Sequence, residues 1–506
     1  MFDVFTVLIR IKRRFIKKDA FFLVLIISLY FITRLINLTK FPIFTDEGIY
    51  IHWAKVAWHD ASWRFISLTD GRQPLQTWLT IPFLKLFPDN ALLAGRLFGV
   101  FSGFFALSGI FALAYYLFGK KVAYITSFLY IITPFYLFFD RLAMVDSLVN
   151  ASFVWLFLFS ILLVRTLRFD VTLIFGLLSG FFLLAKSSVS LFLGLAIFAP
   201  ILTLKKNLKS NIKPMVNFII LFGMVILLSF LIYNVQRLSP FLHFVGEKNK
   251  TFVRTFDEVI KEPFTVFWYN FSYIPIHLIH NLGWATFIFG LFGFYLIFKN
   301  KKSLVFYFLI WMLIPCFIML FFMRVLYSRY FIFLLTPFVI FAAYFFSVRS
   351  KRSVVWPGLL LVSYIFTFYF NYTILFHSPK IPFLPDDRGQ YIESWTSGYG
   401  AKEIVDYVRE KSKEKPVILL AEGNFGMAGD VLDVFLKKDD RITIKGYWPL
   451  NKENIIENKK FLSENFVYAV FAHRENFPLD WPIKLIDRFD KPGNKSSIFF
   501  FQVQEK

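Results

Sequence analysis

Eleven apolar runs, each near the length that crosses a membrane, recur along the first 376 residues of this 506-residue chain. The hydrocarbon core of a bilayer takes about 20 apolar residues per helix. The runs lie near residues 20–39, 91–118, 122–139, 147–164, 171–187, 188–204, 214–234, 284–298, 303–323, 329–347 and 353–376. With 57% hydrophobic residues overall, this pattern predicts a polytopic all-α membrane protein with about 11 transmembrane helices.

Clusters of Lys and Arg mark alternate connections between these runs. They are RIKRRFIKK at 10–18, GKK at 119–121, RTLR at 165–168, KKNLKSNIK at 205–213, KNKK at 299–302 and RSKR at 349–352. Because short cytoplasmic loops are enriched in Lys and Arg, these clusters and the N-terminus are predicted to be cytoplasmic. The loops at 40–90 and 235–283 then lie on the outer face. We therefore expect a multi-pass protein of the cell (plasma) membrane.

Residues 377–506 have a different composition and are predicted to form a soluble, extracytoplasmic α/β domain, with 1–376 as the transmembrane domain. This tail holds 20 basic and 20 acidic residues, so the excess of 56 Lys and Arg over 34 Asp and Glu lies before it and gives no signal for nucleic acid. Two helical patterns, AKEIVDYVREKSKE and DVLDVFLKK, alternate with strand candidates PVILLAE, RITIKGY, FVYAVFA and SIFFFQV. GNFGMAG at 423–429 lacks the dinucleotide and P-loop spacings, so it predicts a plain strand-to-helix turn.

The first outer loop places two adjacent carboxylates, Asp46 and Glu47, directly before an amphipathic helical pattern in FTDEGIYIHWAKVAWHD. One interpretation is structural: Thr45 or Asp46 caps the helix, and Glu47 favours its positive end. The other is chemical, because a helix N-terminus also keeps a carboxylate ionised, as a general base requires. The two interpretations are compatible.

Further charges occur at the predicted outer ends of other spans. The second outer loop, DRLAMVDS, contributes Asp140, Arg141 and Asp146. Lys186 lies between two closely spaced apolar segments, where it either snorkels to lipid headgroups or meets an anion arriving within the membrane. Arg329 and Tyr330 open a later span and offer the same choice.

The outer rim is thus predicted to gather carboxylates and cations from distant segments. A transferase that uses a lipid-phosphate-linked donor needs this combination, because a base must take the acceptor proton and fixed positive charge must stabilise the departing phosphate. The alternative is a lipid or polysaccharide transporter, or flippase. Transporters usually hold charges near the bilayer midplane and contain internal repeats, neither of which we find here.

Six motifs along residues 20–345 resemble those of the polyprenol-phosphate-sugar-dependent glycosyltransferases of the GT-C superfamily. That group includes protein O-mannosyltransferases and lipid A aminoarabinose transferases. The motifs are TDEGIY at 45–50, RQPLQTWL at 72–79, GRLFGVFSG at 95–103, DRLAMVDS at 140–147, LLSGFFLLAKSSV at 177–189 and SRYFIFLLTP at 328–337. Their order and their common outward side carry the resemblance.

The resemblance implies a role for each of these charged residues. Asp46 is the catalytic carboxylate, and Glu47 beside it positions the acceptor or a metal ion. Lys186 meets the donor phosphate, and Arg141 matches the arginine of the second outer loop, so it too is assigned to the phosphate. The pair formed by Arg329 and Tyr330 lies near the donor. Asp146 and Arg72 are supporting residues, because their positions match the second and first outer-loop motifs.

The chain also departs from the family pattern. Arg72-Gln73-Pro74-Leu75 stands where members often have His-Pro-Pro-Leu, and Ala185 precedes Lys186 where they have threonine. A metal requirement, with a divalent ion as the candidate cofactor, is therefore left open.

The implied partners are a polyprenyl-phosphate sugar donor, a lipid, glycan or protein acceptor, and the bilayer. The implied activity is inverting transfer of a hexosyl or pentosyl group on the outer face. The loop at 235–283, with Glu247, Lys248 and Arg254, is either an acceptor wall or an ordinary packed loop.

Overall fold

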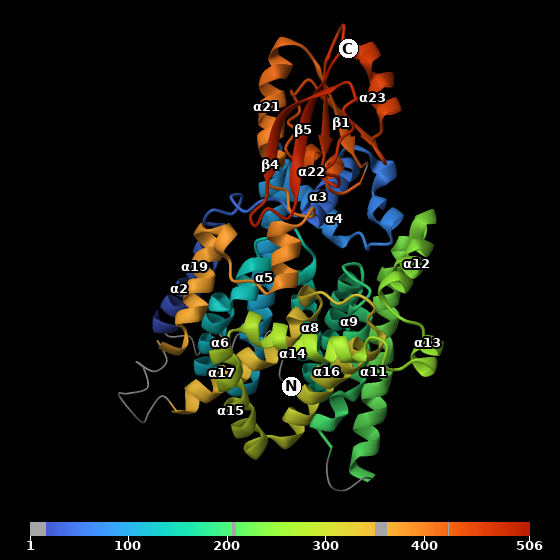
Figure 1. The fold of residues 1–506 in the computed structure, drawn as a ribbon. Coiled ribbons are helices and arrows are strands. Elements are labelled where there is room, and N and C mark those ends of the chain that lie inside the picture. The colour runs from blue at the N-terminus through green and yellow to red at the C-terminus, as the bar shows by residue number, and fades with distance from the viewer. Residues whose placement is uncertain (1–16, 205–208, 350–361, 424, 506) are drawn as a thin grey trace.

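The computed structural model describes residues 17–204, 209–349, 362–423 and 425–505. Helices form a bundle, and a small sheet domain stands at one end of it, here called the sheet end (Figure 1). The basic clusters at 10–18, 205–213 and 349–352 lie partly outside the described residues, as does the first part of the apolar run at 353–376.

Within the described residues, five helices are long and apolar enough to cross a membrane, or six if one bent pair counts as a single span. They are α5 (Ala91–Phe118), α8 (Asp146–Thr166), α11 (Lys209–Tyr233) with the turn after it, α16 (Lys302–Phe322), and η6 (Ser328–Leu334) continued by α17 (Leu335–Arg349). The bent pair is α14 (Phe267–Leu282) and α15 (Trp284–Asn300), which meet at 102°. Gly283 joins them with a φ of +83°, a conformation that favours glycine.

The other apolar runs form shorter or broken helices. These are α2 (Lys17–Leu35), α6 (Lys120–Ile132), α7 (Pro134–Phe139), α9 (Phe169–Leu183), α10 (Val189–Leu195), η3 (Ala196–Leu202) and α19 (Ile365–Phe376). Pro134 shows the cause of one break: it cannot donate to the helix before it, and Thr133 takes an extended conformation. The predicted mostly helical protein with a C-terminal sheet is confirmed, whereas a count of 11 full-length spans is not.

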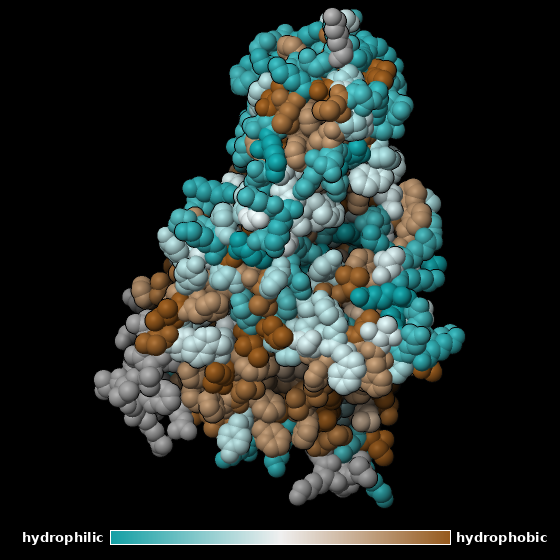
Figure 2. All heavy atoms as spheres, in the orientation of Figure 1, coloured by the Kyte–Doolittle hydropathy of each residue, from teal (hydrophilic) through white to brown (hydrophobic). Residues whose placement is uncertain are grey.

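Hydropathy divides the visible surface into two zones. Hydrophobic residues dominate the lower part of the bundle, and hydrophilic residues cover most of the sheet domain (Figure 2). Helix α11 shows the pattern at residue level, because Ile219, Leu227 and Leu231 are each about 60% exposed. Contiguous apolar surface of this extent suits hydrocarbon rather than water.

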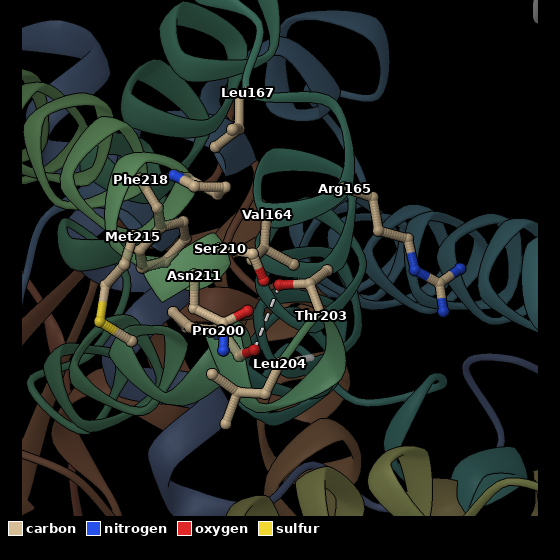
Figure 3. Close-up of a pocket in the computed structure, with 11 residues that line it drawn as sticks. Val164, Arg165, Leu167, Pro200, Thr203, Leu204, Ser210, Asn211, Met215 and Phe218 are labelled. Atoms are coloured by element: carbon tan, nitrogen blue, oxygen red, sulfur yellow. Dashed lines mark hydrogen bonds between the residues drawn. The ribbon is translucent and has the colours of Figure 1, made fainter. Parts of the chain in front are cut away.

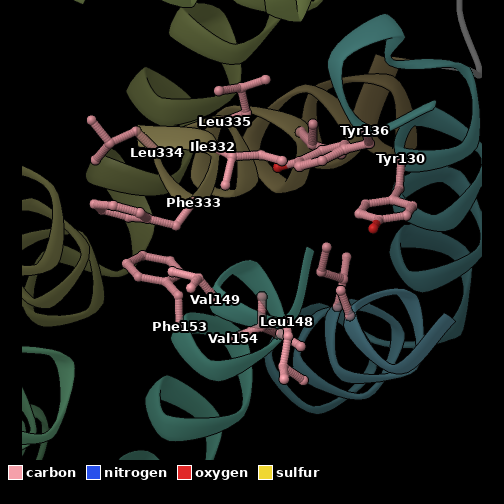
Figure 4. Close-up of a cluster of buried hydrophobic side chains, with 14 of the residues drawn as sticks. Tyr130, Tyr136, Leu148, Val149, Phe153, Val154, Ile332, Phe333, Leu334 and Leu335 are labelled. Atoms are coloured by element: carbon pink, nitrogen blue, oxygen red, sulfur yellow. The ribbon is translucent and has the colours of Figure 1, made fainter. Parts of the chain in front are cut away.

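A dense apolar core joins the start of α8 to η6. Figure 4 shows side chains of both segments in it, and the rings of Phe153 and Phe333 lie 5.1 Å apart. A buried hydrogen-bond chain reinforces the core: Tyr136 Oη lies 2.9 Å from Thr336 Oγ1, which donates to Asn150 Oδ1 at 2.9 Å. Asp146 begins α8 and Arg329 lies in η6, so this core fixes their relative positions.

The C-terminal domain contains a five-stranded sheet of order β2-β1-β3-β5-β4. Its strands are β1 (Val417–Glu422), β2 (Ile442–Tyr447), β3 (Phe466–Phe471), β4 (Ile483–Asp490) and β5 (Ser497–Val503), and its helices are α21 (Ala401–Glu414), α22 (Gly429–Val434) and α23 (Lys452–Asn458). β1 is parallel to β2 and β3, whereas β5 is antiparallel to β3 and β4. The four predicted strands are present; β4 was not anticipated, and α22 is shorter than its predicted pattern.

Short helical segments cover the sheet end of the bundle. They are α3 (Thr45–His59), η1 (Ala61–Trp63), η2 (Ile66–Asp70), α4 (Leu75–Leu86), α12 (His243–Phe252), α13 (Phe256–Lys261), α20 (Pro385–Arg388) and η8 (Gly389–Glu393). The sheet domain rests on α3 through α22 (Figure 1). Helices α3 and α22 lie so close together that a Cβ atom on Gly48 of α3 would be 2.6 Å from Val431 Cγ2 of α22. The position of α3 is therefore tied to both domains.

Candidate functional site

Helix α3 begins at Thr45, and its cap differs from the predicted one. The hydroxyl and the backbone N–H of Thr45 both donate to the carbonyl of Thr396, at 2.8 and 3.0 Å. Phe44 occupies the cap position, and its N–H donates to Glu47 Oε2 at 3.0 Å. The prediction that Thr45 or Asp46 caps this helix is therefore wrong. The carboxylate of Asp46 has other partners.

Two arginines from distant segments hold the carboxylate of Asp46. Arg329 Nη2 lies 3.1 Å from Oδ2, and Arg72 Nη2 lies 3.5 Å from Oδ1. Burial favours the neutral acid, but the charges of Arg72 and Arg329 outweigh burial and lower the pKa of Asp46 below its usual 3.8. Asp46 is therefore ionised at neutral pH, the state in which a carboxylate accepts a proton.

Arg329 is oriented by contacts on several sides. Its Nη1 donates to Gln390 Oε1 and to Tyr391 Oη, both at 3.1 Å. Its guanidinium carbon lies 5.4 Å from the ring centre of Phe44 and 4.9 Å from that of Tyr327. The side chain is only 8% exposed, so the charge stays close to Asp46 in a region of reduced screening.

Arg72 extends the charged network toward α12. Its Nη1 donates to Tyr50 Oη at 2.7 Å, and its Nε pairs with Asp70 Oδ2 at 3.0 Å. Asp70 Oδ1 in turn pairs with Lys248 Nζ at 2.7 Å. Lys248 thus links the 235–283 region to the charged network of the first outer loop.

Lys186 lies beside Asp146, as their shared position at the predicted rim suggested. Its Nζ is 3.1 Å from Asp146 Oδ1 and 4.7 Å from the ring centre of Tyr330. Asp146 is buried, whereas 29% of the Lys186 side chain is exposed. The Lys186 side chain is therefore partly accessible, unlike that of its partner Asp146. Neighbouring contacts fix its turn: the N–H of Leu75 donates to Leu184 O at 2.9 Å.

The structure thus brings six predicted site residues into one group, here called the rim cluster. Its members are Asp46, Arg72, Asp146, Lys186, Arg329 and Tyr330. They come from α3, the segment before α4, the start of α8, the turn before α10, and η6.

Glu47 does not belong to the rim cluster. Its carboxylate is fully buried, and Arg96 Nε and Nη2 each donate to it at 2.9 Å. The N–H of Ala143 adds a third contact at 2.8 Å. Arg96 also donates to the carbonyls of Leu38 and Phe41. With both oxygens bound inside the protein, Glu47 joins α3 to α5 and to the second outer loop.

Arg141 also lies away from the rim cluster. Its Nη1 donates to the carbonyls of Thr33, Arg34 and Ile36, at 2.8 to 2.9 Å. Thr33 and Arg34 belong to the last turn of α2 and Ile36 directly follows it, so the guanidinium caps the negative end of that helix. The neighbouring Asp140 forms a buried ion pair with Arg34 at 3.1 Å.

The 235–283 region is largely helical rather than an open loop. Arg254 donates to the carbonyls of Glu258 and Glu262 at 2.6 and 2.7 Å, which fixes α13. Glu247 is exposed on α12. Of the three residues suggested for an acceptor wall, only Lys248 contacts the network of the rim cluster.

Sequence reasoning missed several residues that shape this site. Gln390 and Tyr391 orient Arg329 but lie in GQYIE, which carries no recognisable motif. Asp70 and Tyr50 bind Arg72. The available signals were that Tyr50 ends the motif TDEGIY and that Asp70 lies two residues before RQPLQTWL. The buried partner of Glu47 could have been sought in GRLFGVFSG, which contains Arg96.

The described side chains around the rim cluster do not form a binding site for a metal ion. Among the described residues, no group of three or more His, Cys, Asp or Glu side chains is placed to hold one. Asp46 and Asp146 instead face cations.

A cavity of about 190 Å³ lies at the opposite end of α8 from Asp146. Val164, Arg165, Pro200 and Phe218 are among its lining residues (Figure 3). It is separate from the rim cluster and next to connections that were predicted to be cytoplasmic.

Comparison with known proteins finds similar solved structures but no similar sequence. No protein-family model matches the chain, and no curated protein matches its sequence. Among solved structures, ArnT from Cupriavidus metallidurans bound to undecaprenyl phosphate is similar at a TM-score of 0.61, with 12% identity over 95% of this chain and 97% of that one. The apo form of that protein gives a TM-score of 0.59, with 13% identity and the same coverage.

The apo oligosaccharyltransferase of Archaeoglobus fulgidus is also similar, at a TM-score of 0.52 with 14% identity over 90% of this chain and 70% of that one. At these identities the likeness shows the fold alone. It confirms the GT-C fold that the sequence motifs predicted.

Proposed function

We propose that this chain is an integral membrane glycosyltransferase that moves one sugar from a polyprenyl-phosphate carrier to an acceptor on the outer face of the membrane. The observation that carries the proposal is the position of the Asp46 carboxylate between Arg72 and Arg329, with the partly exposed Lys186 in the same cluster. A base and several fixed cations are what displacement of a phosphate requires. The similar ArnT binds undecaprenyl phosphate, which supports this class of donor.

In the proposed reaction, the acceptor oxygen attacks the anomeric carbon of the sugar. The bond from that carbon to the phosphate oxygen breaks, and polyprenyl phosphate leaves with both bonding electrons. Asp46 takes the acceptor proton, while Lys186 and Arg329 stabilise the charge that develops on the phosphate. Attack opposite the leaving group inverts the anomeric configuration.

The two arginines give Asp46 a second property. They hold the pKa of Asp46 below its usual value, which makes it a weak base. A phosphate that binds Arg329 competes with Asp46 for its guanidinium group and brings negative charge close to the Asp46 carboxylate. The pKa of Asp46 then rises, and the base strengthens only when the donor is in place.

This proposal changes two roles that the family resemblance implied. Glu47 holds the start of α3 through Arg96, and Arg141 holds the end of α2, so we assign both to positioning. Donor phosphate contacts are assigned to Lys186, Arg329 and Tyr330. Arg72 and Asp146 are supporting residues, each paired with one of the reacting charges.

Mass spectrometry of lipid that co-purifies with the full chain from its native membrane tests the donor class. We expect a polyprenyl phosphate, with or without a sugar. Recovery of ordinary phospholipids alone would contradict the proposal. Reconstitution in liposomes tests the flippase alternative, which predicts that intact carrier lipid crosses the bilayer without sugar transfer.

A further inference from the structure

Three aromatic side chains gather on the surface of the sheet domain. The ring of Trp395 lies 4.6 Å from that of His473, and the ring of Trp448 lies 5.2 Å from it at 82°. Trp395 is 45% exposed and Trp448 is 67% exposed. Two exposed tryptophans around one histidine are unusual for a surface that serves only solvation, because each leaves a large apolar ring in water. We call this group the aromatic platform.

The aromatic platform lies at the edge of the sheet where ligands of α/β domains usually bind. Trp448 directly follows β2, and His473 follows β3, so both lie beyond the carboxyl ends of the two parallel strands that flank β1. Glu422 ends β1 between them. Its Oε1 accepts from Arg474 Nε at 2.8 Å.

Glu422 also carries an unsatisfied acceptor. Its Oε2 atom is buried and has no hydrogen-bond partner among the residues that the structure describes. A buried carboxylate oxygen without a donor is costly, and such groups mark places where a ligand or ordered water supplies the missing hydrogen bond.

Covalent and hydrogen-bonded links connect the aromatic platform to Asp46. Trp395 directly precedes Thr396, whose carbonyl accepts from both donors of Thr45. From the other side, the N–H of Gly423 donates to Tyr447 O, next to Trp448. The same loop then reaches α3, because Gly426 lies against Thr45. A ligand on the platform would therefore lie close to the start of α3.

We infer that the aromatic platform binds a sugar ring of the acceptor, so that the acceptor is a glycan. A pyranose has a face of C–H groups that packs against the electron-rich face of an indole, while its hydroxyls at the ring edge hydrogen-bond to water or to polar groups. The role of the platform as an acceptor site rests on the proposed glycosyltransferase function. Its binding of a sugar does not depend on that function.

Saturation-transfer NMR on the full-length protein tests this inference. The protein must be held in a detergent without a sugar headgroup, because glycoside detergents would occupy the site. The probes are chitotriose, mannotriose and maltotriose, with a Ser/Thr-rich peptide as the competing class. We expect at least one trisaccharide to receive saturation, and Trp395→Ala and Trp448→Ala each to weaken its binding by about fivefold or more.

Trp268→Ala is the matched control, because Trp268 on α14 is 66% exposed but lies outside the aromatic platform. It should bind the trisaccharide as the parent does, and Trp448→Phe should retain most binding. Unchanged melting curves would show that the variants are folded. The inference fails if no trisaccharide binds, if the platform variants bind as well as the parent, or if the platform holds only the peptide.

The lipid analysis described above, made on the same preparations, separates the two proposals. Trisaccharide binding without a carrier lipid would overturn the transferase, whereas carrier lipid without trisaccharide binding would overturn the platform alone.

Discussion

Asp46 and Glu47 are adjacent, yet they have different partners. Successive residues of an α-helix point about 100° apart, so neighbouring carboxylates at a helix start leave the backbone in different directions. Glu47 turns inward to Arg96, while Asp46 turns toward Arg329 and Arg72. Substitutions at these two adjacent positions therefore compare a proposed chemical role, at Asp46, with a structural one, at Glu47.

Asp46→Asn should lower sugar transfer roughly a hundredfold to ten-thousandfold, because the amide keeps the size of the side chain but cannot accept the proton. Donor binding and the melting temperature should stay near those of the parent. Glu47→Gln is the matched control. It removes a charge from a fully buried ion pair and should mainly lower stability, by about 3 kcal/mol or more.

The measurements are transfer rate, donor affinity and thermal unfolding for both variants beside the parent. Full transfer activity in Asp46→Asn would rule out Asp46 as the base.

Lys186→Met should weaken donor binding by about tenfold or more while the protein remains folded, because the apolar stem is kept and only the charge is lost. This change also leaves the buried Asp146 without its partner. The double variant with Asp146→Asn removes that stranded charge. If Lys186 binds the phosphate, the double variant stays defective in donor binding; recovery of binding would show that Lys186 serves only the ion pair.

At the scale of elements, periodicity predicted the interiors of helices and strands better than their ends. The amphipathic pattern located α3, although its cap was assigned to the wrong residue. Apolar composition did not show where the run at 122–139 would break, because that depends on Pro134 and on local packing. Strand β4 was missed because its sequence IKLIDRFD is polar and mostly exposed, so no apolar alternation marks it.

The contact between α3 and α22 contains titratable side chains. His52 Nδ1 lies 2.8 Å from Asp433 Oδ2, which also pairs with Lys55, while His52 Nε2 is 3.7 Å from Asp430 Oδ1. Burial lowers the pKa of His52, but Asp433 and Asp430 outweigh burial and raise it above 6.5. The same contacts lower the pKa of Asp433 to about 2 against the effect of burial.

The directions of these two pKa shifts define the pH range in which the contact between α3 and α22 is most stable. A raised His52 pKa adds stability below pH 6.5 that is lost as pH rises through the folded value, and a lowered Asp433 pKa adds stability above pH 3.8 that is lost on acidification. His52→Gln should therefore reduce the fall in melting temperature between pH 6 and 8.5, on the order of 2 °C. Melting curves at both pH values check this. An identical pH dependence in the variant would contradict it.

Across the whole chain, the sequence predicted which charges lie together better than it predicted what each one contacts. Six of the eight assigned residues form the rim cluster, although they come from segments up to 284 positions apart. Glu47 and Arg141 were misplaced because composition does not show whether a charge points outward or into a helix junction. Gln390 and Tyr391 had no sequence signal, because only the folded chain brings residues after α19 back to η6.

Helix α5 relates the position of the rim cluster to the two sides of a membrane. Arg96 near the start of α5 pairs with Glu47 beside the rim cluster, whereas the carbonyl of Leu117 near its end accepts from Lys301 Nζ at 2.7 Å. The 28 residues of α5 span about 42 Å, more than a bilayer core of about 30 Å. The rim cluster and the basic connections at 119–121 and 299–302 therefore lie on opposite sides of any membrane that surrounds α5.

Because Lys and Arg favour the cytoplasmic side, reporters fused after residue 120 or 300 should read cytoplasmic, and those after 60, 260 or 400 should read external. Protease protection in sealed vesicles gives an independent measurement of the same sides. A cytoplasmic sheet domain would place Asp46 where nucleotide sugars are made and would remove the reason for a lipid-linked donor. The topology therefore decides between donor classes even before any turnover is measured.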